Sequence, residues 1–428
     1  VGQNALSLDT KGDLNTAIGI GALQSQNFTT STDSYNTAVG GFAGGNVTSG
    51  LFNTLLGGLA GNALTDADSN VAVGQNALSA DTLGSLSVAI GQGALAAQNF
   101  TTATNSFNIA VGYDAGKAVT TGTNNVFIGS TAGGLITTGL SNVAIGDQAL
   151  KNEDAHGLNV AVGAQALFTQ NAGADAYNVA VGFQAGVAIT TGVQNTFVGG
   201  FAGDGCNDAN HCTAVGYLAL SANTGDSATA VGMNAAQKAT GQNTTAVGKD
   251  TLLNVTSGGN NIGLGQQAGV TGSPGGNQTT GSNAVFIGDE NISAAHIQVD
   301  WTVASDERDK TDFTALDVGL DFVNALNPVT YKWDKRSLYV NKQDPEVDLD
   351  KVTHDGTHKE DWLDIGFKAQ EVEALEKAAG YKIAEKNNLT TTLTEDGKQY
   401  GIQYSKFVPI LVKAIQELTA RIKTLEDG

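Results

Sequence analysis

Cys206, His211 and Cys212 are the residues of the long N-terminal part best suited to chemistry, and they lie together in the segment GDGCNDANHCTAVG. The two cysteines are the only ones in the chain. A zinc site would need a fourth ligand and a tighter pattern. Free thiols are therefore the favoured prediction. A disulfide that closes this small loop, and a metal held on the axis of a trimer, stay open as alternatives, but no metal and no cofactor are predicted.

Three other patterns were weighed as sites. The segments GQGAL at Gly91 and GLGQQAG at Gly263 imitate a dinucleotide-binding fingerprint, but they recur with the repeat described below and precede no convincing helix. His354 and His358 lie in the charged segment THDGTHKED, where we expect them to be solvated. A glycosidase needs two carboxyl groups that flank the scissile bond, whereas the acidic residues of the N-terminal part are scattered. A polysaccharide-cleaving site built between chains stays open as an alternative function.

The charge of the chain changes abruptly at Ser305. Residues 1–304 contain 5 Lys, no Arg and 18 Asp and Glu, whereas residues 305–428 contain 17 Lys and Arg and 24 Asp and Glu. Nucleic acids and anionic lipids are bound by clustered Lys and Arg, so neither is a predicted partner. No stretch approaches the roughly 18 apolar residues of a membrane span, so no membrane insertion is predicted. The residue types of SDERDK alone favour a helix-capping serine ahead of a solvated run of charges.

A short repeat organises the first part of the chain. Its unit is N-[TV]-A-[VI]-G-x-x-A-[LG], as in NVAVGQNAL at Asn70 and NVAIGDQAL at Asn142. Most repeats are 17 residues apart, which fits one coil of a β-solenoid. Val71 and Val73 alternate with Ala72, so each unit contains a strand with β-branched residues on one face and small residues on the other. Stacked coils would place the asparagines in a ladder that satisfies their amides.

A second period of 72 residues lies over the first. QNFTTSTDSYN at Gln26, QNFTTATNSFN at Gln98 and QNAGADAYN at Gln170 are insertions into every fourth coil. Aromatic rings among hydroxyls and amides suit carbohydrate binding, so the insertions are candidate receptor-binding loops. The alternative is that the rings pack onto the rod or onto a neighbouring chain. The candidate receptor-binding residues are Phe28, Tyr35, Phe100, Phe107 and Tyr177.

The part after Ser305 has helical and strand periods. Leu316, Leu320, Val323 and Leu326 are spaced as on a helix that Pro328 ends, and a strand follows it. WLDIGFKAQEVEALEKAAG predicts a short strand and a helix that closes at Gly380. The last helix is predicted to begin at Ser405 as its N-cap. It carries a heptad seam that indicates self-association, or else an amphipathic helix on its own domain. The seam residues are Val408, Leu411, Ile415, Leu418, Ile422 and Leu425.

Two resemblances add to these patterns. The repeat units resemble the head repeats of trimeric autotransporter adhesins, whose N-x-V-A-I-G coils form left-handed β-rolls packed three to a rod; this resemblance covers most of residues 1–290. SDERDK, GLDFVNALNPVTYKW, IGFKAQEVEAL and YGIQYSKFVPILVKAIQEL occur in the order seen in the endosialidase-type intramolecular chaperone domain of bacteriophage tail fibres and spikes. That resemblance implies a domain that trimerises, directs the folding of the upstream rod and then cuts itself off.

The second resemblance also assigns roles to residues. By matching position, Ser305 is the nucleophile that attacks the carbonyl of Ala304, and Lys310 is the base of a self-cleaving serine-lysine protease. This chemistry needs a neutral amine, which burial or nearby cations favour, and backbone donors for the oxyanion. Asp309 stands where the family usually has an apolar residue. A carboxylate beside Lys310 would favour the charged amine and slow the cleavage.

We therefore expect a mostly β protein that forms a homotrimer. Residues 1–290 form a β-solenoid rod of about 17-residue coils, residues 291–304 are a linker with the cleavage site, and residues 305–428 are a small α+β chaperone domain ending in a coiled-coil helix. The predicted function is that of a phage tail fibre that binds a host cell-surface glycan or protein receptor. It is assembled in the host cytoplasm, carried on the virion and attached to an upstream tail component. A purely structural fibre is the further alternative.

Overall fold

The fold was analysed in a computed structural model, which describes residues 2–299, 301–342 and 347–428. The chain divides into two compact units. The first comprises residues 1–263 and 282–285, and the second comprises residues 264–281 and 286–428. The first unit is the predicted β-solenoid, and the second contains the predicted small domain of helices and short strands that ends in a long helix. The predicted fold class is thus confirmed.

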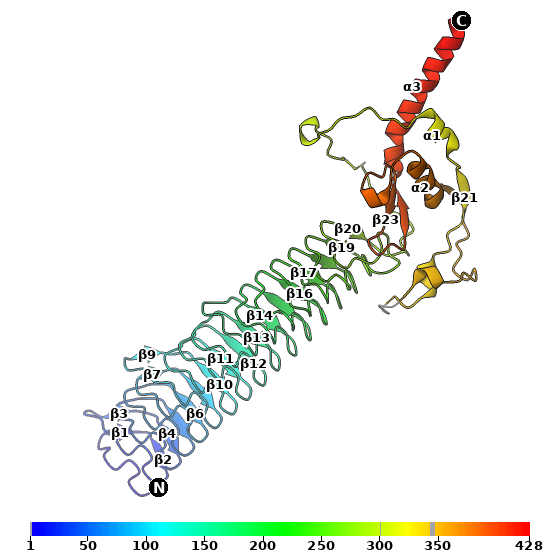
Figure 1. The fold of residues 1–428 in the computed structure, drawn as a ribbon. Coiled ribbons are helices and arrows are strands. Elements are labelled where there is room, and N and C mark those ends of the chain that lie inside the picture. The colour runs from blue at the N-terminus through cyan, green and yellow to red at the C-terminus, as the bar shows by residue number, and fades with distance from the viewer. Residues whose placement is uncertain (1, 300, 343–346) are drawn as a thin grey trace. The chain divides into compact units, whose positions relative to one another are not determined.

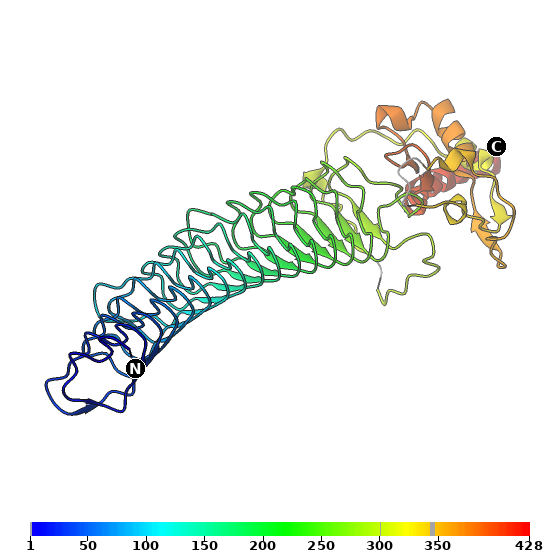
Figure 2. The same ribbon diagram turned by 90° about the horizontal axis from the view of Figure 1, so that it is seen from below.

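One parallel ladder of 16 three-residue strands forms the solenoid sheet, and the strands follow one another in chain order along one side of the coils (Figures 1 and 2). Each strand pairs with the equivalent residues of the next coil, as Ile109 does with Val126. The strands are β2 (Thr16–Ile18), β4 (Thr37–Val39), β5 (Thr54–Leu56), β6 (Val71–Val73), β8 (Val88–Ile90), β10 (Ile109–Val111), β11 (Val126–Ile128), β12 (Val143–Ile145), β13 (Val160–Val162), β14 (Val179–Val181), β15 (Thr196–Val198), β16 (Thr213–Val215), β17 (Thr229–Val231), β18 (Thr245–Val247), β19 (Ile262–Leu264) and β20 (Val285–Ile287).

The interior of the coils is narrow. In every three-residue strand from β4 to β20 the middle residue is buried, and it is alanine in most of them. The larger exceptions include Phe127 and Phe197, each opposite glycines in the same layer: a Cβ on Gly133 would lie 2.3 Å from the Phe127 ring. Small and large side chains therefore alternate so that each layer fills its space.

The glycine after each strand is required by backbone geometry. Gly112 has φ +142°, and a Cβ there would lie 2.4 Å from the carbonyl oxygen of Gly129 in the next coil. Consecutive coils thus approach one another backbone to backbone at the turn, and this leaves no room for a side chain. The recurrence of this glycine in the sequence follows from the contact.

The predicted asparagine ladder is present, with more backbone partners than expected. Asn125 is fully buried, and its Oδ1 accepts a hydrogen bond from the backbone N–H of Asn142 at 2.9 Å. Its Nδ2 donates to the carbonyl of Gly139 at 2.9 Å. Asn125 therefore satisfies an N–H and a C=O of the following coil, which sheet hydrogen bonds leave unpaired.

Replacement of Asn125 by alanine is expected to lower the free energy of unfolding of the rod by about 2 to 4 kcal/mol, because two buried backbone groups each lose a partner. The exposed Ser130 lies on the same coil, and Ser130→Ala is the matched control, with an expected change near zero. Denaturant midpoints of the two variants measure the difference. Equal midpoints would show that the ladder adds little to stability.

The insertions form small sheets of their own in two of the three places. β1 (Gly12–Asp13) pairs with β3 (Thr32–Asp33), and β7 (Gly84–Ser85) pairs with β9 (Thr104–Asn105), both in parallel. The third insertion, at Gln170, has no such pair in the described part of the chain. Each of the first two insertions is thus tied to the coil before it.

The second unit has a small core of Val318, Phe322, Val372, Phe407 and Ile410. β21 pairs with β22 and β23 with β24, both antiparallel. No helix among the described residues is long and apolar enough to cross a membrane. The elements are η1 (Glu307–Asp309), α1 (Leu320–Ala325), β21 (Val329–Tyr331), η2 (Arg336–Tyr339), η3 (Leu349–Lys351), β22 (Asp364–Gly366), α2 (Ala369–Ala378), η4 (Ile383–Glu385), β23 (Thr391–Leu393), β24 (Tyr400–Ile402), η5 (Tyr404–Lys406) and α3 (Phe407–Glu426).

Two details of this unit differ from the sequence prediction. Ser405 is not an N-cap, because it lies inside the 3-10 turn η5 and α3 begins at Phe407. The first helix is also shorter than its hydrophobic spacing suggested: α1 begins at Leu320, whose backbone N–H donates to the Glu417 carboxylate of α3 at 2.8 Å. The packing of α1 against α3 thus sets where the helix begins.

The second unit begins earlier in the chain than the predicted chaperone domain, because the hairpin β23–β24 holds residues 264–281. Glu395, in the turn of that hairpin, accepts backbone hydrogen bonds from Thr279 at 3.2 Å, Thr280 at 3.1 Å and Gly281 at 3.1 Å. Burial raises the pKa of the Glu395 carboxyl, but the Thr280 hydroxyl and these backbone donors together outweigh it and leave the pKa below its usual value. The Glu395 carboxylate therefore stays ionised, and it fixes the loop of residues 279–281 by accepting their backbone N–H groups.

Candidate functional site

Ser305 and Lys310 lie in direct contact. The Nζ of Lys310 is 2.6 Å from the Oγ of Ser305 and 3.2 Å from its carbonyl oxygen. Ala304, whose carbonyl the serine would attack, is the preceding residue. A hydroxyl and an amine at this distance can exchange a proton, which is the geometric requirement for a nucleophile and its base. The structure therefore brings the predicted pair together.

A single 3-10 turn closes the five-residue separation. Asp306 caps η1, since its Oδ1 accepts from the backbone N–H of Arg308 at 2.9 Å. The guanidinium of Arg308 also pairs with the Asp306 carboxylate at 2.6 Å and holds the pKa of that carboxyl below its usual value. The N–H of Lys310 donates to the carbonyl of Glu307 at 3.1 Å. The charged residues of SDERDK thus build the turn that returns Lys310 to Ser305.

The surroundings of the pair are open. Residues 301–310 are exposed in the single chain. Among the ion pairs of the described residues, none joins Asp309 to Lys310. The carboxylate that was expected to hold the amine charged is therefore not in contact with it.

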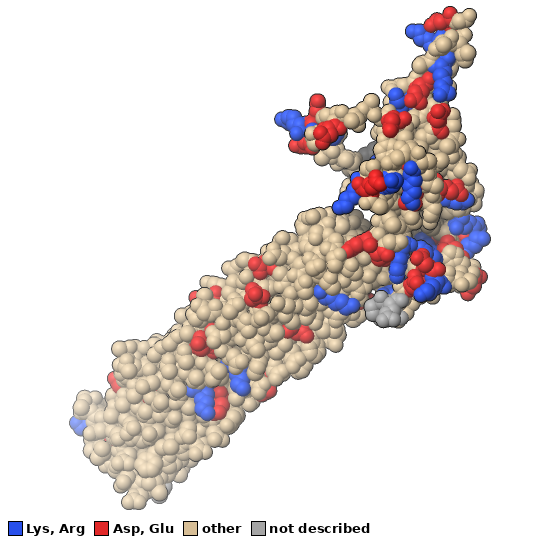
Figure 3. Space-filling view, viewed as in Figure 1, with Lys and Arg blue, Asp and Glu red and all other residues tan. Residues whose placement is uncertain are grey.

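The outward face of the solenoid sheet is uncharged and largely apolar. The first residue of every strand is Thr, Val or Ile, and these positions are at least partly exposed. The third residue is always aliphatic, which makes an unbroken row along the sheet: Ile18, Val39, Leu56, Val73, Ile90, Val111, Ile128, Ile145, Val162, Val181, Val198, Val215, Val231, Val247, Leu264 and Ile287. Charged side chains are also sparse on the solenoid surface seen in Figure 3 and dense on the C-terminal unit. Monomeric soluble proteins rarely expose so long an apolar surface.

The seam of α3 is exposed in the same way. Phe407, Ile410 and Ala414 are the buried residues of the helix and belong to a different stripe. The helix therefore packs on its own domain through one stripe and leaves the heptad stripe uncovered. The seam residues Val408, Leu411, Ile415, Leu418, Ile422 and Leu425 are 43 to 82% exposed.

The five predicted receptor-binding aromatics fall into two groups. Phe28 and Phe100 are only 8% and 5% exposed, because their rings lie over Gly12 and Gly84 of the preceding coil. For these two residues the burial contradicts a role as receptor contacts and favours the alternative that the rings pack onto the rod. Tyr35, Phe107 and Tyr177 are each 51 to 54% exposed and stand directly before a buried asparagine, with φ near +50°. The Tyr35 ring also stacks on Phe52 of the next coil, with centroids 5.9 Å apart. These three rings are on the surface of the rod.

Sequence reasoning missed a second group of surface aromatics. Phe183, Phe201 and Tyr217 come from three consecutive coils, and their rings meet edge to face with centroids 5.2 and 5.9 Å apart. Phe183 and Tyr217 are each 51% exposed. The signal in the sequence is weak, since the rings lie 16 to 18 residues apart and not within one insertion.

Cys206 and Cys212 are both free, as favoured, and the predicted disulfide alternative is wrong. Burial, with a smaller contribution from Cys212, raises the pKa of the Cys206 thiol to about 12. His211 is exposed, and these residues form no group of three close metal-ligand atoms in the described chain. His354 and His358 are exposed, as expected, and lie against the Tyr339 ring.

Comparison with known proteins gives one match. Residues 305–381 match the family model described as the chaperone of endosialidase. The matched segment begins at Ser305 and includes Lys310, α1, β21 and α2, and it ends before the hairpin β23–β24 and α3. A search of curated proteins and a search of solved structures each found no match. The C-terminal part of the chain is thus similar to an intramolecular chaperone, and the part before it is a β-solenoid.

Proposed function

We propose that this chain is a bacteriophage tail fibre or tail appendage: a trimeric β-solenoid rod that attaches to the host surface, followed by an intramolecular chaperone that directs assembly and cuts itself off before Ser305. The observation that carries the proposal is the 2.6 Å contact of Lys310 Nζ with Ser305 Oγ at the first residue of the segment similar to the endosialidase chaperone. Cleavage by the Ser305–Lys310 pair at this point would release the chaperone segment from the solenoid rod.

The contact of Lys310 with Ser305 supports the following cleavage step. Lys310 takes the proton of the Ser305 hydroxyl, and the Oγ attacks the carbonyl carbon of Ala304. The bond between that carbon and the Ser305 nitrogen breaks, the nitrogen takes a proton, and the resulting ester is hydrolysed by water. The amine has to be neutral to act as a base, and removal from water favours the neutral form. Because residues 301–310 are exposed in the single chain, we expect cleavage to follow the association of chains that covers this segment.

The partners that cover the apolar surfaces are further copies of this chain. The row of aliphatic residues repeats once per coil, so a surface with the same repeat fits it layer by layer. A second copy of this chain has a surface with the same repeat, and its uncharged row places no charge against the aliphatic residues. The exposed seam of α3 joins the same copies at the C-terminal end. Holding the chains together at one end limits misregister of long strand ladders, which pair slowly and expose adhesive edges.

The surface aromatics of the insertions are the proposed receptor contacts, and the ligand is a host cell-surface glycan or protein. Tyr35, Phe107 and Tyr177 present half-exposed rings beside hydroxyl and amide side chains. An upstream tail component would hold the fibre on the virion, after assembly in the host cytoplasm.

Replacement of Tyr35, Phe107 and Tyr177 by alanine together is expected to weaken adsorption to host cells by about 2 kcal/mol, or roughly 30-fold. The matched control replaces the aromatic cluster of Phe183, Phe201 and Tyr217 by alanine. Adsorption of the purified fibre to cells measures both. Unchanged binding by the first variant and lost binding by the second would move the receptor site to the other aromatics. Release of reducing ends from host polysaccharide would instead favour the depolymerase alternative.

A further inference from the structure

The 72-residue period provides three equivalent copies of one carboxylate site, and the carboxylate is fully buried in the second and third copies. Its carboxylate is Asp9, Asp81 or Glu153, and the buried Gln26, Gln98 or Gln170 stands beside it on the next coil. In the first two copies the Gln Nε2 donates to the Asp Oδ2, at 2.5 Å for Asp9 and 2.6 Å for Asp81. The site in these copies is a closed hydrogen-bond network.

The third copy differs at three positions that touch one another in the first two. Asp81 becomes Glu153, Gly84 becomes His156 and Phe100 becomes Ala172. In the second copy, a Cβ on Gly84 would lie 2.1 Å from the Asp81 carboxylate and 2.7 Å from the Phe100 ring. A histidine is thus accommodated only after the carboxylate has shifted and the ring has been removed. The three replacements together make room for an imidazole.

The replacements leave buried polar atoms without partners. Glu153 is fully buried, and its Oε2 has no hydrogen-bond partner in the described chain. Among the described residues, the buried Nε2 of Gln170 has no hydrogen-bond partner, and the buried Nδ1 of His156 makes no hydrogen bond and only an ion-pair contact with the Glu153 Oε1 at 3.5 Å. Gln170 itself is held as in the other copies, because its Oε1 accepts from Asn178 at 2.7 Å. The shift of the carboxylate therefore opens the network at this copy alone.

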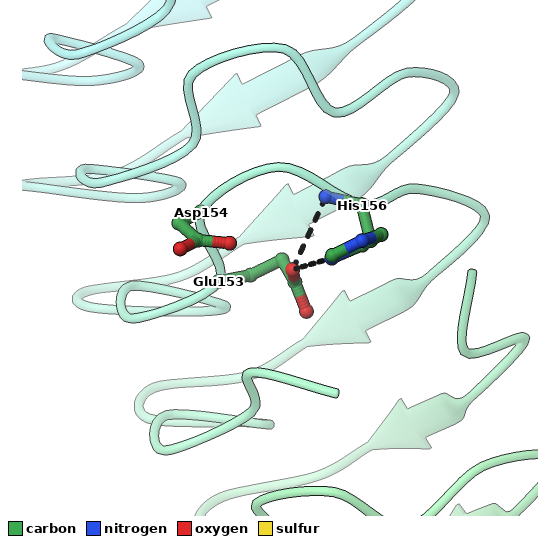
Figure 4. Close-up of side chains that lie close together, drawn as sticks. All are labelled: Glu153, Asp154 and His156. Atoms are coloured by element: carbon green, nitrogen blue, oxygen red, sulfur yellow. Dashed lines mark hydrogen bonds and ion pairs between the residues drawn. The ribbon is translucent and has the colours of Figure 1, made fainter. Parts of the chain in front are cut away.

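We propose that Glu153, Asp154 and His156 bind a divalent transition-metal ion, with zinc preferred. One ligand atom from each residue lies within 4.8 Å of the others, a spacing that allows one ion to be shared. Figure 4 shows the three side chains on one turn of the coil, with Glu153 joined to His156 and Asp154 beside it. An imidazole with two carboxylates is a ligand set that suits zinc and its neighbours better than calcium or magnesium.

The negative charge of the site suits a cation. The His156 Nδ1 is 3.5 Å from the Glu153 Oε1, so the imidazole nitrogen and the carboxylate can both reach one ion. Glu153 is fully buried and its Oε2 accepts no hydrogen bond in the described chain, and a buried carboxylate is costly unless its charge is compensated. A bound metal ion would neutralise this charge and use the unpartnered oxygen. Asp154 is exposed and the His156 side chain is 29% exposed, so the ion has an entry path and room for a water ligand.

Calorimetric titration of the metal-free full chain with Zn²⁺ tests the site. The matched variant is E153D/H156G/A172F, which restores the residues of the second copy and is expected to keep the rod folded. His156→Gln, which removes a single ligand, is expected to weaken Zn²⁺ binding by about tenfold or more. The native chain should bind one Zn²⁺ per chain more than the triple variant, and Zn²⁺ should raise the thermal midpoint of the native chain alone.

Three results would overturn the proposal. They are equal Zn²⁺ stoichiometry in the native chain and the triple variant, unchanged affinity in His156→Gln, and binding of Ca²⁺ in preference to Zn²⁺. Equal thermal midpoints of the metal-free native chain and triple variant would show that the substitutions remove the site without unfolding the rod. An imidazolium–carboxylate pair alone would appear as a native chain that takes up no extra Zn²⁺. Other histidines and cysteines contribute equally to both chains and cancel in the difference.

Discussion

A Ser305→Ala chain is expected to remain a single polypeptide of 428 residues under conditions in which the native chain separates into residues 1–304 and 305–428. The variant keeps the turn η1, which Asp306 and Arg308 hold, and removes only the oxygen that lies 2.6 Å from Lys310 Nζ. Without a nucleophile no ester with Ala304 forms. Intact-mass spectrometry of the purified proteins measures the outcome directly, since it gives the mass of each fragment.

Lys310→Met is expected to give the same single chain, because it leaves the serine without its base. Asp309→Leu restores the apolar residue usual in the family that the sequence resembles, and it is the informative control. Asp309 makes no ion pair with Lys310 in the described chain, so we expect cleavage at an unchanged or faster rate. Identical gel patterns for the native and Ser305→Ala chains would mean that this chain does not process itself.

The repeat made the solenoid predictable, because the physical causes of the fold recur in every coil. Gly112 and its equivalents are fixed by backbone contact between coils, and Asn125 and its equivalents by unpaired backbone groups. The alternation of residue types along each strand does not tell which face of the strand points inward. Alanine fills the inward position at the middle of most strands, and the aliphatic third residues of the strands face outward. For these outward strand residues, the usual rule that large apolar side chains lie inside holds only if other chains cover them.

The Ser305–Lys310 pair was predictable from the resemblance to the endosialidase-type chaperone domain, and less so from the residue types alone. SDERDK reads as a capped turn, and the structure has that turn, with Asp306 and not Ser305 as the cap. The hairpin β23–β24 was missed, although an Asp-Gly turn at Asp396 and Gly397 marks it. The burial of Phe28 depends on the coil across from it, since its ring lies where Gly12 has no side chain. Contacts of this kind cannot be derived from the local pattern.

The exposed apolar surface of the rod also explains why we expect a chaperone to be needed. Its outward row runs through all 16 strands without a charge, so a single rod in solution exposes a continuous apolar surface to other nascent rods. Association in the wrong register buries nearly as much of this surface as association in the right one, because the row repeats at every coil. The row alone therefore does not select the register, and a device at one end of the chains has to do so.

A chain that ends at Gly288 is accordingly expected to yield aggregated or monomeric rod and no soluble trimer. It keeps the apolar row but loses the seam of α3, where Val408, Ile415 and Leu425 are at least half exposed. Size-exclusion chromatography with light scattering measures the oligomeric state. The control is full-length Ser305→Ala, which retains the C-terminal unit and is expected to form a soluble trimer even though it is not cut. A soluble trimer of the truncated chain would contradict the chaperone proposal and leave the cleavage chemistry unaffected. An aggregated Ser305→Ala chain would show instead that release of the C-terminal unit is itself required for solubility.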